Sequence, residues 1–415
     1  MKQVIRILAL LLALMTLTGC TAVQEIIRQI LPDETTAPVT EASTEAATQA
    51  TTEATAEAAT EAADPPTEAA AEPSLVLDLC PTVYVNGTAI SRTGMSGETV
   101  YACAAEFCAA LGGTAAEDGT VTLDYNGVCY TFSPNYAHMM RGEKATVLLS
   151  PIVCFQNQAY LPLEELCQML ELSVFWDTEE NTVYCTAAAR QREIPEGYDV
   201  PVLMYHAVDD DPWGIPELFV KIERLEEQLQ FLTENGYETI FFEDLYHIEN
   251  YEKPVILTFD DGYLDNYTNL FPLLQEYNCK ATVFVIEQYI DNDAYYMTTE
   301  QVRQMADSGL VSIQSHTVTH PNLDELDQQE QRLELEQSKL LIARMTRREP
   351  YVLCYPTGRY NDDTLEVIGN SYNFGIKMNG GLYTTQDSPF EINRYYISRD
   401  TSISSFEAKV SEAFE

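Results

Sequence analysis

The chain has 415 residues, of which 65 are Asp or Glu and only 23 are Lys or Arg, so its formal net charge at pH 7 is −42. A chain this acidic repels phosphate backbones, which excludes nucleic acid as a partner. The charge also disfavours adhesion to acidic polymers without bridging cations, whereas a neutral glycan, or a glycan with free amines, is compatible with it.

The first 20 residues have the pattern of a targeting segment. Lys2 and Arg6 form a positive start, and residues 7–17 form an apolar run that is short for a membrane span. The run ends in Leu-Thr-Gly-Cys, which resembles the lipobox of bacterial lipoproteins. This resemblance implies that Cys20 becomes the first residue and carries a lipid. The protein would then be anchored to the membrane on the extracellular face of the bacterial cell. An ordinary signal peptide with a cysteine near the cleavage site is the alternative.

Residues 21–74 are predicted to form a disordered tether. Between residues 32 and 73 the sequence consists almost entirely of Thr, Glu, Ala and Pro. Such a segment has too few large apolar side chains to offset the entropy cost of ordering, and its spaced Glu residues repel one another. We expect it to hold the folded part away from the membrane.

Residues 75–190 are predicted to form a small α+β domain. Strand-like runs are joined by Asn-Gly turns, with short amphipathic helices between them. A weak internal repeat relates residues 98–123 to residues 158–185, each with the order strand, helix, strand, turn, strand. The region is similar to the domain named after the N-terminal domain of copper amine oxidases. That resemblance implies a structural or glycan-contacting stalk without copper, and His138 is the one histidine present.

Beyond the lipobox the chain has nine cysteines, seven of them between Cys80 and Cys185 and the others at Cys279 and Cys354. An extracellular location permits disulfides, but an odd number leaves at least one thiol unpaired. Several of these residues, such as Cys167, occupy positions where an apolar side chain would fit. The sequence therefore leaves both buried thiols and disulfides open.

A second folded region is predicted to span residues 198–415. Its first strand ends in Tyr205 and His206, at the sheet end where loops surround the active sites of parallel barrels. A loop that carries Trp213 follows this strand. Residues 219–235 then have the apolar periodicity of an amphipathic helix.

A buried strand leads directly into two adjacent carboxylates, Asp260 and Asp261. The run VILTFDDG, residues 255–262, is typical of a buried strand in a parallel sheet, whose carboxyl end holds the chemistry. A solvated, inert Asp-Asp-Gly turn is the alternative. His316 and His320 favour a site, because histidines at i and i+4 share one face if the segment turns helically. Two imidazoles and one carboxylate form an open metal site of the catalytic kind.

The TFDDG and SHTVTH segments resemble the first two motifs of the polysaccharide deacetylases, carbohydrate esterase family 4, whose catalytic unit is called the NodB homology domain. The order is strand, Asp pair, helix, strand, helix, strand, His pair, with the later strands at residues 281–286 and 311–315. The resemblance covers the chain from about Val200 to the C-terminus. It implies an α/β fold, a distorted and incomplete (β/α) barrel of the NodB homology type, preceded here by the small α+β domain.

The third motif of this family is matched only in part. It resembles residues 351–358, YVLCYPTG, in which Tyr, Pro and Gly fit but the Arg that usually holds the catalytic Asp is absent. Arg359 and Arg394 are candidates to replace it. The fourth motif is not recognisable, and the His of the fifth motif is missing because no histidine follows the second motif.

The resemblance implies a role for each residue that matches a motif. Asp261, His316 and His320 would hold a divalent metal ion, with zinc as the expected metal. Asp260 would act as the general base, and the backbone N–H of Thr357 would stabilise the oxyanion.

The general acid has to be sought among the five histidines. His138 lies in the stalk, His247 lies on a polar segment, and two are the expected ligands, which leaves His206 as the candidate. A structural histidine that closes a barrel strand is the alternative for His206. Asp260 in its protonated form is a second candidate for the acid.

Five residues that flank the motifs are expected to contact substrate: Tyr205, Trp213, Tyr355, Pro356 and Arg394. The expected activity is removal of N-acetyl groups from a cell-wall glycan or exopolysaccharide that contains N-acetylglucosamine. Two other functions stay open. A catalytically silent glycan-binding protein is favoured by the missing Arg and His, and an O-acetyl esterase acting on a polysaccharide shares the same metal chemistry.

Overall fold

The computed structural model describes residue 75 and residues 80–116, 119–133, 139–142, 144–146, 148, 150, 152–378 and 380–414. The predicted signal peptide with Cys20, the predicted tether and His138 lie outside the described residues. Within the described part of the chain, no helix is both long enough and apolar enough to cross a membrane.

The N-terminal region consists of short strands and two helices. In chain order these are β1 (Thr82–Val85), β2 (Thr88–Ile90), β3 (Thr93–Ser96), β4 (Thr99–Cys103), α3 (Ala104–Ala109), β5 (Thr114–Ala115), β6 (Val121–Tyr125), β7 (Val128–Phe132), β8 (Met139–Arg141), β9 (Lys144–Thr146), β10 (Val153–Phe155), β11 (Gln158–Pro162), α4 (Leu163–Met169), β12 (Ser173–Asp177) and β13 (Thr182–Thr186). They form three sheets, ordered β12–β13–β1–β2, β10–β11–β4–β3 and β5 to β9.

The internal repeat is visible in this region. Strand β4 runs directly into α3, and β11 runs directly into α4. The two strands pair antiparallel, with Leu161 opposite Ala102. Side chains from both copies, including Phe107 and Leu166, share one buried cluster. The region is therefore an α+β unit, as predicted, while its likeness to the copper amine oxidase domain stays a prediction.

No disulfide joins two cysteines in the described part of the chain. Six of the thiols are buried: Cys103, Cys108, Cys167, Cys185, Cys279 and Cys354. Burial raises the pKa of the Cys108 thiol to about 12, so it stays protonated and packs as a small apolar side chain. Of the two alternatives for the cysteines, the structure has buried thiols.

The second region alternates strands and helices. In chain order these are β14 (Asp199–Val200), β15 (Val202–Tyr205), β16 (Ala207–Val208), η1 (Pro216–Leu218), β17 (Phe219–Val220), α5 (Ile222–Glu234), β18 (Glu238–Thr239), η2 (Phe242–Asn250), β19 (Pro254–Phe259), η3 (Asn266–Leu270), α6 (Phe271–Tyr277), β20 (Ala281–Val285), η4 (Glu287–Tyr289), α7 (Thr299–Asp307), β21 (Val311–Ser315), η5 (Leu323–Glu325), α8 (Gln328–Thr346), β22 (Val352–Cys354), η6 (Pro356–Gly358), α9 (Asp362–Ile368), β23 (Phe374–Ile376), β24 (Tyr383–Thr384), β25 (Tyr395–Tyr396), α10 (Ile403–Ser411) and η7 (Glu412–Phe414).

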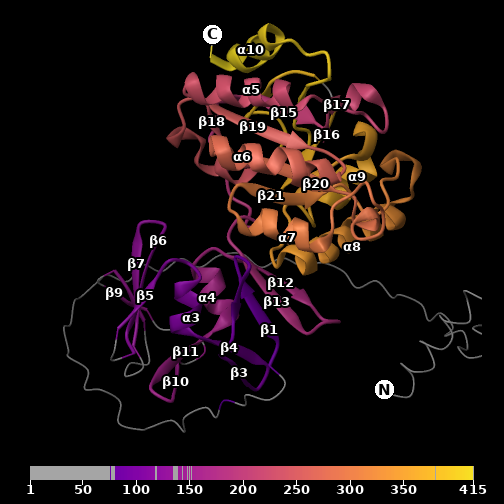
Figure 1. Ribbon diagram of the computed structural model, residues 1–415. Helices are drawn as coiled ribbons and strands as arrows, with labels where there is room; N and C mark the ends of the chain where they lie inside the picture. The colour runs from indigo at the N-terminus through magenta and orange to yellow at the C-terminus, as the bar shows by residue number, and fades with distance from the viewer. Residues whose placement is uncertain are drawn as a thin grey trace, which may run out of the picture. The chain divides into compact units, whose positions relative to one another are not determined.

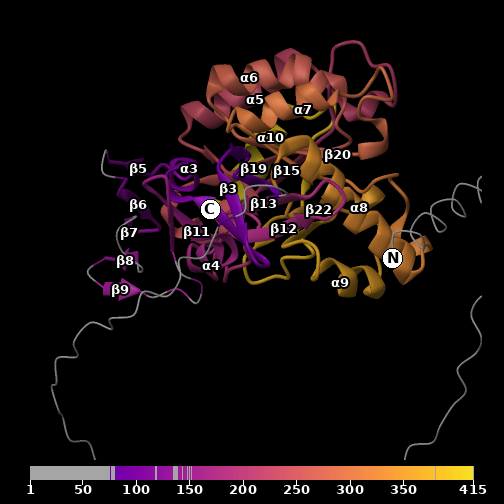
Figure 2. The same ribbon diagram turned by 90° about the horizontal axis from the view of Figure 1, so that it is seen from below.

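One curled, parallel sheet organises this region. Its strands follow the order β23–β22–β21–β20–β19–β15–β25, and β18 also pairs with β19. Helices α5, α6, α7 and α8 lie along its outer side, and α9 lies beside α8 near β22 (Figures 1 and 2). Among the described residues no ladder joins the end strands β23 and β25. Ile376, the last residue of β23, forms an isolated bridge with Ile392, which precedes β25. The fold is thus the distorted, open (β/α) barrel that the sequence predicted.

Side chains alternate between the two faces of the sheet. Leu203 and Tyr205 of β15 pack with Leu225 of α5 in the cluster under the helices, whereas Val202 belongs to a separate cluster. All six residues of β19 are buried, because both faces of this strand are covered. This confirms the predicted buried strand ahead of the Asp pair.

Two predicted helices differ in extent. The sequence predicted a helix from residue 219, but Phe219 and Val220 form β17, which pairs in parallel with β16, and α5 begins at Ile222. The predicted helix after the Asp pair is a π-helical turn, η3, followed by α6.

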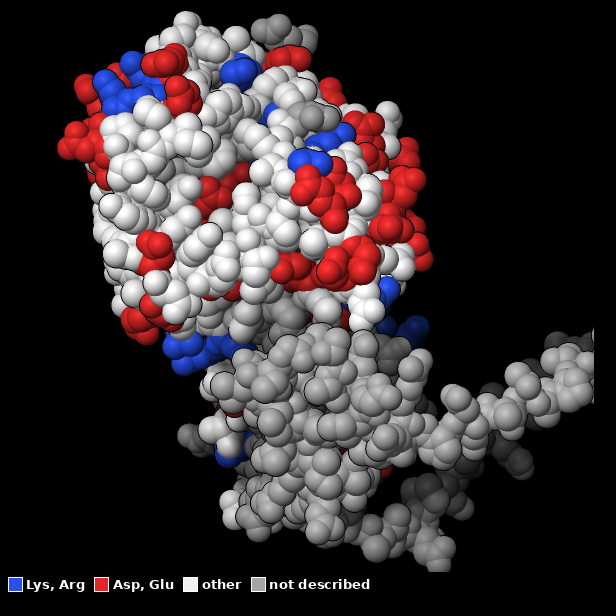
Figure 3. Space-filling model, turned by 90° about the vertical axis from the view of Figure 1, so that its right-hand side faces the viewer, with Lys and Arg blue, Asp and Glu red and all other residues white. Residues whose placement is uncertain are grey.

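Asp and Glu dominate the charged side chains on the face in Figure 3, as the net charge requires.

Candidate active site

Strand register places two polar side chains side by side at the carboxyl end of the sheet. Tyr205 of β15 pairs with Phe259 of β19, so the residues that follow them, His206 and Asp260, emerge next to each other. The Asp260 N–H donates to the Tyr205 carbonyl at 3.0 Å. Nε2 of His206 lies 3.9 Å from Oδ2 of Asp260, which is contact without a direct hydrogen bond.

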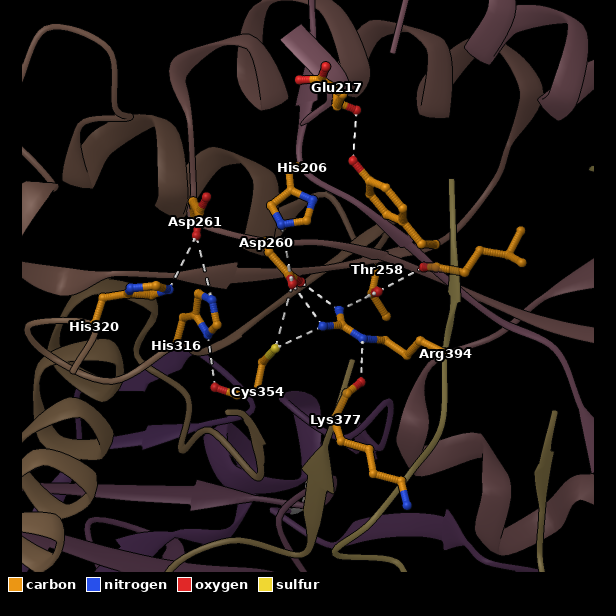
Figure 4. A network of polar contacts seen from close by, with 12 residues as sticks. His206, Glu217, Thr258, Asp260, Asp261, His316, His320, Cys354, Lys377 and Arg394 are labelled. Carbon is orange, nitrogen blue, oxygen red and sulfur yellow. Dashed lines mark hydrogen bonds and ion pairs between the residues drawn. The ribbon is translucent and has the colours of Figure 1, made fainter. Parts of the chain in front are cut away.

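A buried arginine holds Asp260 (Figure 4). Nη1 of Arg394 donates to Oδ1 at 2.7 Å and Nη2 donates to Oδ2 at 2.8 Å, which is the bidentate geometry of a strong, directional ion pair. Nη1 also donates to Thr258 Oγ1 at 3.0 Å, and Nε donates to the Lys377 carbonyl at 3.1 Å. The Arg394 side chain is fully buried. These contacts fix the orientation of the carboxylate.

Arg394 reaches Asp260 along the sheet. Leu203 pairs with both Leu257 and Tyr395, so Arg394 lies level with Ile256 of β19. Ile256 precedes Asp260 by four residues, so the long Arg394 side chain must extend along the strand to reach the carboxylate. Thr258 and Asp260 are two residues apart on this strand and therefore point to the same face. The guanidinium contacts both of these side chains.

The charge state of Asp260 follows from this pairing. Burial acts to raise the pKa of Asp260, but the charge and hydrogen bonds of Arg394 outweigh it and hold that pKa well below its usual range. Asp260 is therefore a carboxylate at any physiological pH. A fixed, ionised and buried carboxylate is suited to take a proton from a water molecule.

The Cys354 thiol lies where the partial third motif meets this pair. Its Sγ lies 3.7 Å from Oδ2 of Asp260 and 3.2 Å from Nη2 of Arg394. The segment in which the family usually has its arginine thus contributes a small thiol, and the arginine comes from the position directly before β25. The other candidate, Arg359, pairs with two acidic side chains of η5 and does not contact Asp260. The structure therefore places Arg394 in the position to replace the missing arginine.

Asp261 leaves the extended conformation with a φ of 79°. In a continuing strand it would point away from Asp260, but the left-handed backbone turns its carboxylate toward the histidines (Figure 4). Burial and the nearby Asp261 carboxylate raise the pKa of Tyr263 well above its usual value. Gly262 follows with a φ of 79°, and a Cβ there would lie 2.9 Å from the Val285 side chain, so the turn requires glycine.

His316 and His320 lie on a loop, so the condition of a helical turn is not met. Thr317 and His320 have φ values of 65° and 57°, which break any helical run. The loop nevertheless brings the two rings together, with centroids 4.7 Å apart. The prediction that these histidines share one site is compatible with this geometry, although the backbone reason differs.

The histidine loop is supported from α8. Glu334 Oε2 accepts hydrogen bonds from the N–H groups of Val318 at 2.9 Å and Thr319 at 3.0 Å. Ser315 Oγ accepts from the Thr317 N–H at 3.1 Å. Sequence reasoning missed Glu334 because nothing in a helical Glu distinguishes it from a solvated one.

Asp261, His316 and His320 form a cluster with the donor set of a metal site. Nε2 of His316 and Nε2 of His320 lie 3.5 and 3.9 Å from Oδ1 of Asp261, and the three ligand atoms all lie within 4.8 Å of one another. Nδ1 of His316 lies 2.8 Å from the Cys354 carbonyl, a contact that orients the ring. Burial lowers the pKa of His316 to about 4, so it is neutral, the form that binds a cation. Two imidazoles and one carboxylate fit zinc.

A second group of potential ligands overlaps the first. Asp260, His316 and Cys354 also lie within 4.8 Å of one another. Both oxygens of Asp260 are already bonded to Arg394. Burial raises the pKa of Cys354 well above its usual value, so the thiol keeps its proton and does not act as a thiolate ligand. The first cluster is therefore the better cation site.

The remaining predicted catalytic residues are His206, which lies beside Asp260, and Thr357, which lies in the turn after β22. Thr357 is exposed in the turn after β22, with a φ of 55°, and its Oγ1 donates to Asn322 Oδ1 at 2.8 Å. His206 is 9% exposed, and its Nδ1 has no partner among the described residues. Its ring meets Tyr396 edge-on at 6.2 Å. The roles of Thr357 as oxyanion donor and His206 as acid stay predictions.

Two of the predicted substrate contacts fail because the side chains are buried in other contacts. Arg394 is fully buried against Asp260 and has no face left for substrate. Tyr205 lies under the helices, where its hydroxyl donates to Gln228 at 2.9 Å. The alternation of the strand explains this, since His206 points into the site and its predecessor must point out.

Of the other three, one remains accessible. Tyr355 is buried, with its hydroxyl donating to the Phe390 carbonyl at 2.7 Å, and Pro356 is buried beside it, so both predicted contacts are wrong. Trp213 is 38% exposed on its loop. It is the predicted substrate residue that the structure leaves free to meet a ligand.

Comparison with known proteins decides the family. A family model described as polysaccharide deacetylase matches residues 247–372. YxkH of Bacillus subtilis, named as a candidate polysaccharide deacetylase, is 33% identical over 217 residues, which cover 51% of this chain and 76% of YxkH. The chain belongs to the polysaccharide deacetylase family. The segment matched by the family model contains the Asp pair and the His pair of this deacetylase, but it includes neither His206 nor Arg394.

Relatives with named substrates match a smaller part of this deacetylase. The poly-β-1,6-N-acetyl-D-glucosamine N-deacetylase of Escherichia coli K12 is 25% identical over 255 residues, which cover 50% of this chain and 38% of the relative. The Staphylococcus aureus MRSA252 protein of the same name is 24% identical over 162 residues, 36% of this chain and 56% of the relative. The chain thus spans less than two thirds of either relative. Among solved structures, Streptococcus pyogenes deacetylase PplD in complex with acetate is 28% identical, with a TM-score of 0.49, over 51% of this chain and 98% of PplD.

Proposed function

We propose that this polysaccharide deacetylase is a metal-dependent hydrolase that removes N-acetyl groups from a glycan containing N-acetylglucosamine, in the cell wall or in an exopolysaccharide. The observation that carries the proposal is the Asp260–Arg394 pair directly beside the Asp261, His316 and His320 cluster. The names of the E. coli and S. aureus relatives support a polymer of N-acetylglucosamine as the substrate class.

The residues divide the work of amide hydrolysis. Asp261, His316 and His320 would hold zinc or another divalent cation, which supplies a Lewis acid and lowers the pKa of a bound water. Asp260 takes the proton of the attacking water. The Thr357 N–H donates to the oxyanion, and His206 protonates the leaving amine.

The contact between Arg394 and Asp260 is relevant to the alternative in which the protein binds glycans but has no catalytic activity. A glycan-binding protein without activity was favoured by the missing third-motif arginine. Arg394 supplies the two hydrogen bonds to Asp260 from the position before β25, which removes that reason, whereas the missing histidine of the fifth motif still favours the alternative. An O-acetyl esterase needs the same cluster and the same base, but its leaving group is not an amine. The choice of substrate therefore distinguishes an O-acetyl esterase from an N-deacetylase.

Acetate release is the experiment that tests this function. The purified protein, supplied with zinc, is given N-acetylated and O-acetylated oligosaccharides, with an Asp260→Asn variant as the inactive control. We expect acetate from the N-acetylated substrates. Release from O-acetylated substrates alone would identify an esterase, and binding without release from either would identify a silent protein.

We further propose that the protein is lipid-anchored at Cys20 on the extracellular face of the bacterial membrane. The lipobox-like Leu-Thr-Gly-Cys after a short apolar run supports this location. The Thr/Glu/Ala-rich segment that follows would give the catalytic region reach to a wall or capsule glycan.

A further inference from the structure

Two loops next to Asp261 leave large apolar side chains exposed. The described residues include seven such side chains, and three of them, Trp213 at 38%, Ile215 at 62% and Tyr295 at 52%, belong to these loops. The Tyr295 carbonyl accepts from the Leu264 N–H at 2.8 Å, and Tyr263 forms a bridge with Tyr296. The second loop is thereby fixed to the segment that directly follows the Asp pair.

The aromatic rings of these loops form a packed group that leads to Asp261. Trp213 and Tyr295 stack at 4.3 Å with 23° between their planes. The indole meets Tyr263 edge-on at 4.9 Å and Phe219 edge-on at 5.2 Å, so it is supported on three sides. Tyr263 follows Asp261 by two residues in the chain and is tied to the Tyr295 loop by its bridge with Tyr296. Tyr295 is therefore held against the indole and half exposed, and two ring contacts separate it from Tyr263, which lies two residues after Asp261.

The chemistry of an exposed aromatic face that is held in place determines which ligand it can bind. The axial C–H groups of a pyranose ring pack well on such a face, while its hydroxyls stay in water. The acidic surface disfavours anionic sugars, so a neutral sugar suits this position. A single exposed apolar side chain needs no explanation, but three on two adjoining loops next to the Asp pair do.

We propose that Tyr295, backed by Trp213, is a subsite that binds a second pyranose of a neutral glycan chain while another sugar of the same chain lies at the Asp260 and Asp261 cluster. The proposal rests on the proposed function for the reaction and makes the substrate a chain of sugars and not a single one. Tyr295 and Trp213 act here through binding, and they take no part in bond cleavage.

The test compares chain lengths. Full-length protein with Asp260→Asn, which stops turnover, is titrated with single N-acetylglucosamine and with its β-1,4 and β-1,6 pentamers, with and without Tyr295→Ala. We expect Tyr295→Ala to weaken pentamer binding about 3- to 10-fold, the range for loss of one aromatic packing partner. In active protein the ratio of kcat/KM for pentamer to dimer should fall by a similar factor, and Tyr295→Phe should restore it.

Phe414→Ala is the matched control, because Phe414 is 36% exposed in the same region and packs edge-on against Tyr237. The proposal is overturned if Tyr295→Ala leaves pentamer binding unchanged, or if Phe414→Ala weakens it equally. If the protein releases acetate but Tyr295→Ala does not change the pentamer-to-dimer ratio of kcat/KM, the subsite is overturned and the proposed function stands. If pentamer binding depends on Tyr295 but no acetate is released, the subsite stands and the proposed function is overturned. No binding of any oligosaccharide would overturn both.

Discussion

Arg394 and Asp260 are 134 residues apart in the sequence and are joined by two hydrogen bonds in a fully buried ion pair. Removing one partner of such a pair leaves an uncompensated buried charge, at a cost of about 3–5 kcal/mol. The pair therefore fixes both the geometry and the protonation state of the candidate base.

We expect Arg394→Lys to lower kcat on the order of 100-fold, because a point charge cannot keep the carboxylate in the bidentate orientation. The pKa of Asp260 should also rise, since burial is then less fully opposed. The base must be ionised, so the acidic limb of the kcat/KM profile should move to higher pH. A pH–rate profile of Arg394→Lys against wild type measures both effects.

Arg359→Lys is the control for this prediction, because Arg359 pairs with surface acids and was the other candidate. It should leave the profile unchanged. A sharper variant combines Arg394→Ala with Cys354→Arg, which returns the arginine to the third-motif segment and should recover part of the lost rate. If Arg359→Lys shifts the profile and Arg394→Lys does not, the assignment of Arg394 is wrong.

The metal prediction concerns the histidine loop. His316→Ala and His320→Ala should each reduce bound zinc in the purified protein and abolish acetate release, because each removes one of three protein ligands. Metal content by mass spectrometry is the direct measurement. Cys354→Ser separates the two overlapping clusters, since it should keep the metal. Stoichiometric zinc in a variant that lacks both histidines would refute the cluster.

The sequence predicted the parts of this site that are local. The apolar run before Asp260 and Asp261 and the strand before His316 are short, buried and followed directly by polar residues, so their place at the carboxyl end of the sheet follows from pattern alone. The alternation of the first strand also separates His206, which faces the cleft, from Tyr205, which faces the helices. The same alternation excludes Tyr205 from the substrate contacts.

The features of the site that the sequence did not predict depend on contacts between segments that are distant in the chain. Arg394 meets Asp260 because β25 pairs with β15 in one particular register, which no local pattern reveals. The left-handed φ at Asp261 and His320 is set by tertiary packing, and neither residue type requires it. Glu334 supports the histidine loop from the middle of α8, where acidic residues are usually solvated.

Asp265 gives a prediction for stability against pH. Burial raises its pKa to about 6, while a hydrogen bond from the Val208 N–H opposes the shift. The folded state thus keeps a proton that the unfolded state loses near pH 4. The stability this carboxyl contributes is complete below about pH 4 and is lost as pH rises through about 6.

Asp265→Asn removes this dependence while its side-chain oxygen can still accept from Val208. Between pH 4 and pH 7, the unfolding free energy of the variant should gain about 1–3 kcal/mol relative to wild type. Urea unfolding at both pH values is the measurement. The exposed Asp400, changed to Asn, serves as the control and should show no such gain. An equal difference at both pH values would contradict the prediction.

The anchor prediction is tested at Cys20. Cys20→Ser should release the protein from membranes or leave it as an uncleaved precursor, because the lipid is attached to that thiol. Fractionation and migration of the variant in cells check this. If Cys20→Ser fractionates and migrates like wild type, the lipobox interpretation is wrong.

The last prediction concerns His206. Its imidazole lies 3.9 Å from Asp260, and no histidine in the sequence follows His320. A general acid typically contributes about 10²–10⁴-fold, so His206→Ala should lower amide turnover by that order with metal content unchanged. An aryl ester should suffer much less, because a phenolate leaves without a proton and an amine does not. His247→Ala, at an exposed histidine outside the site, is the control. Equal losses on amide and ester, with a lower melting temperature, would make His206 structural and move the acid to Asp260, whereas loss of zinc would make it a fourth ligand.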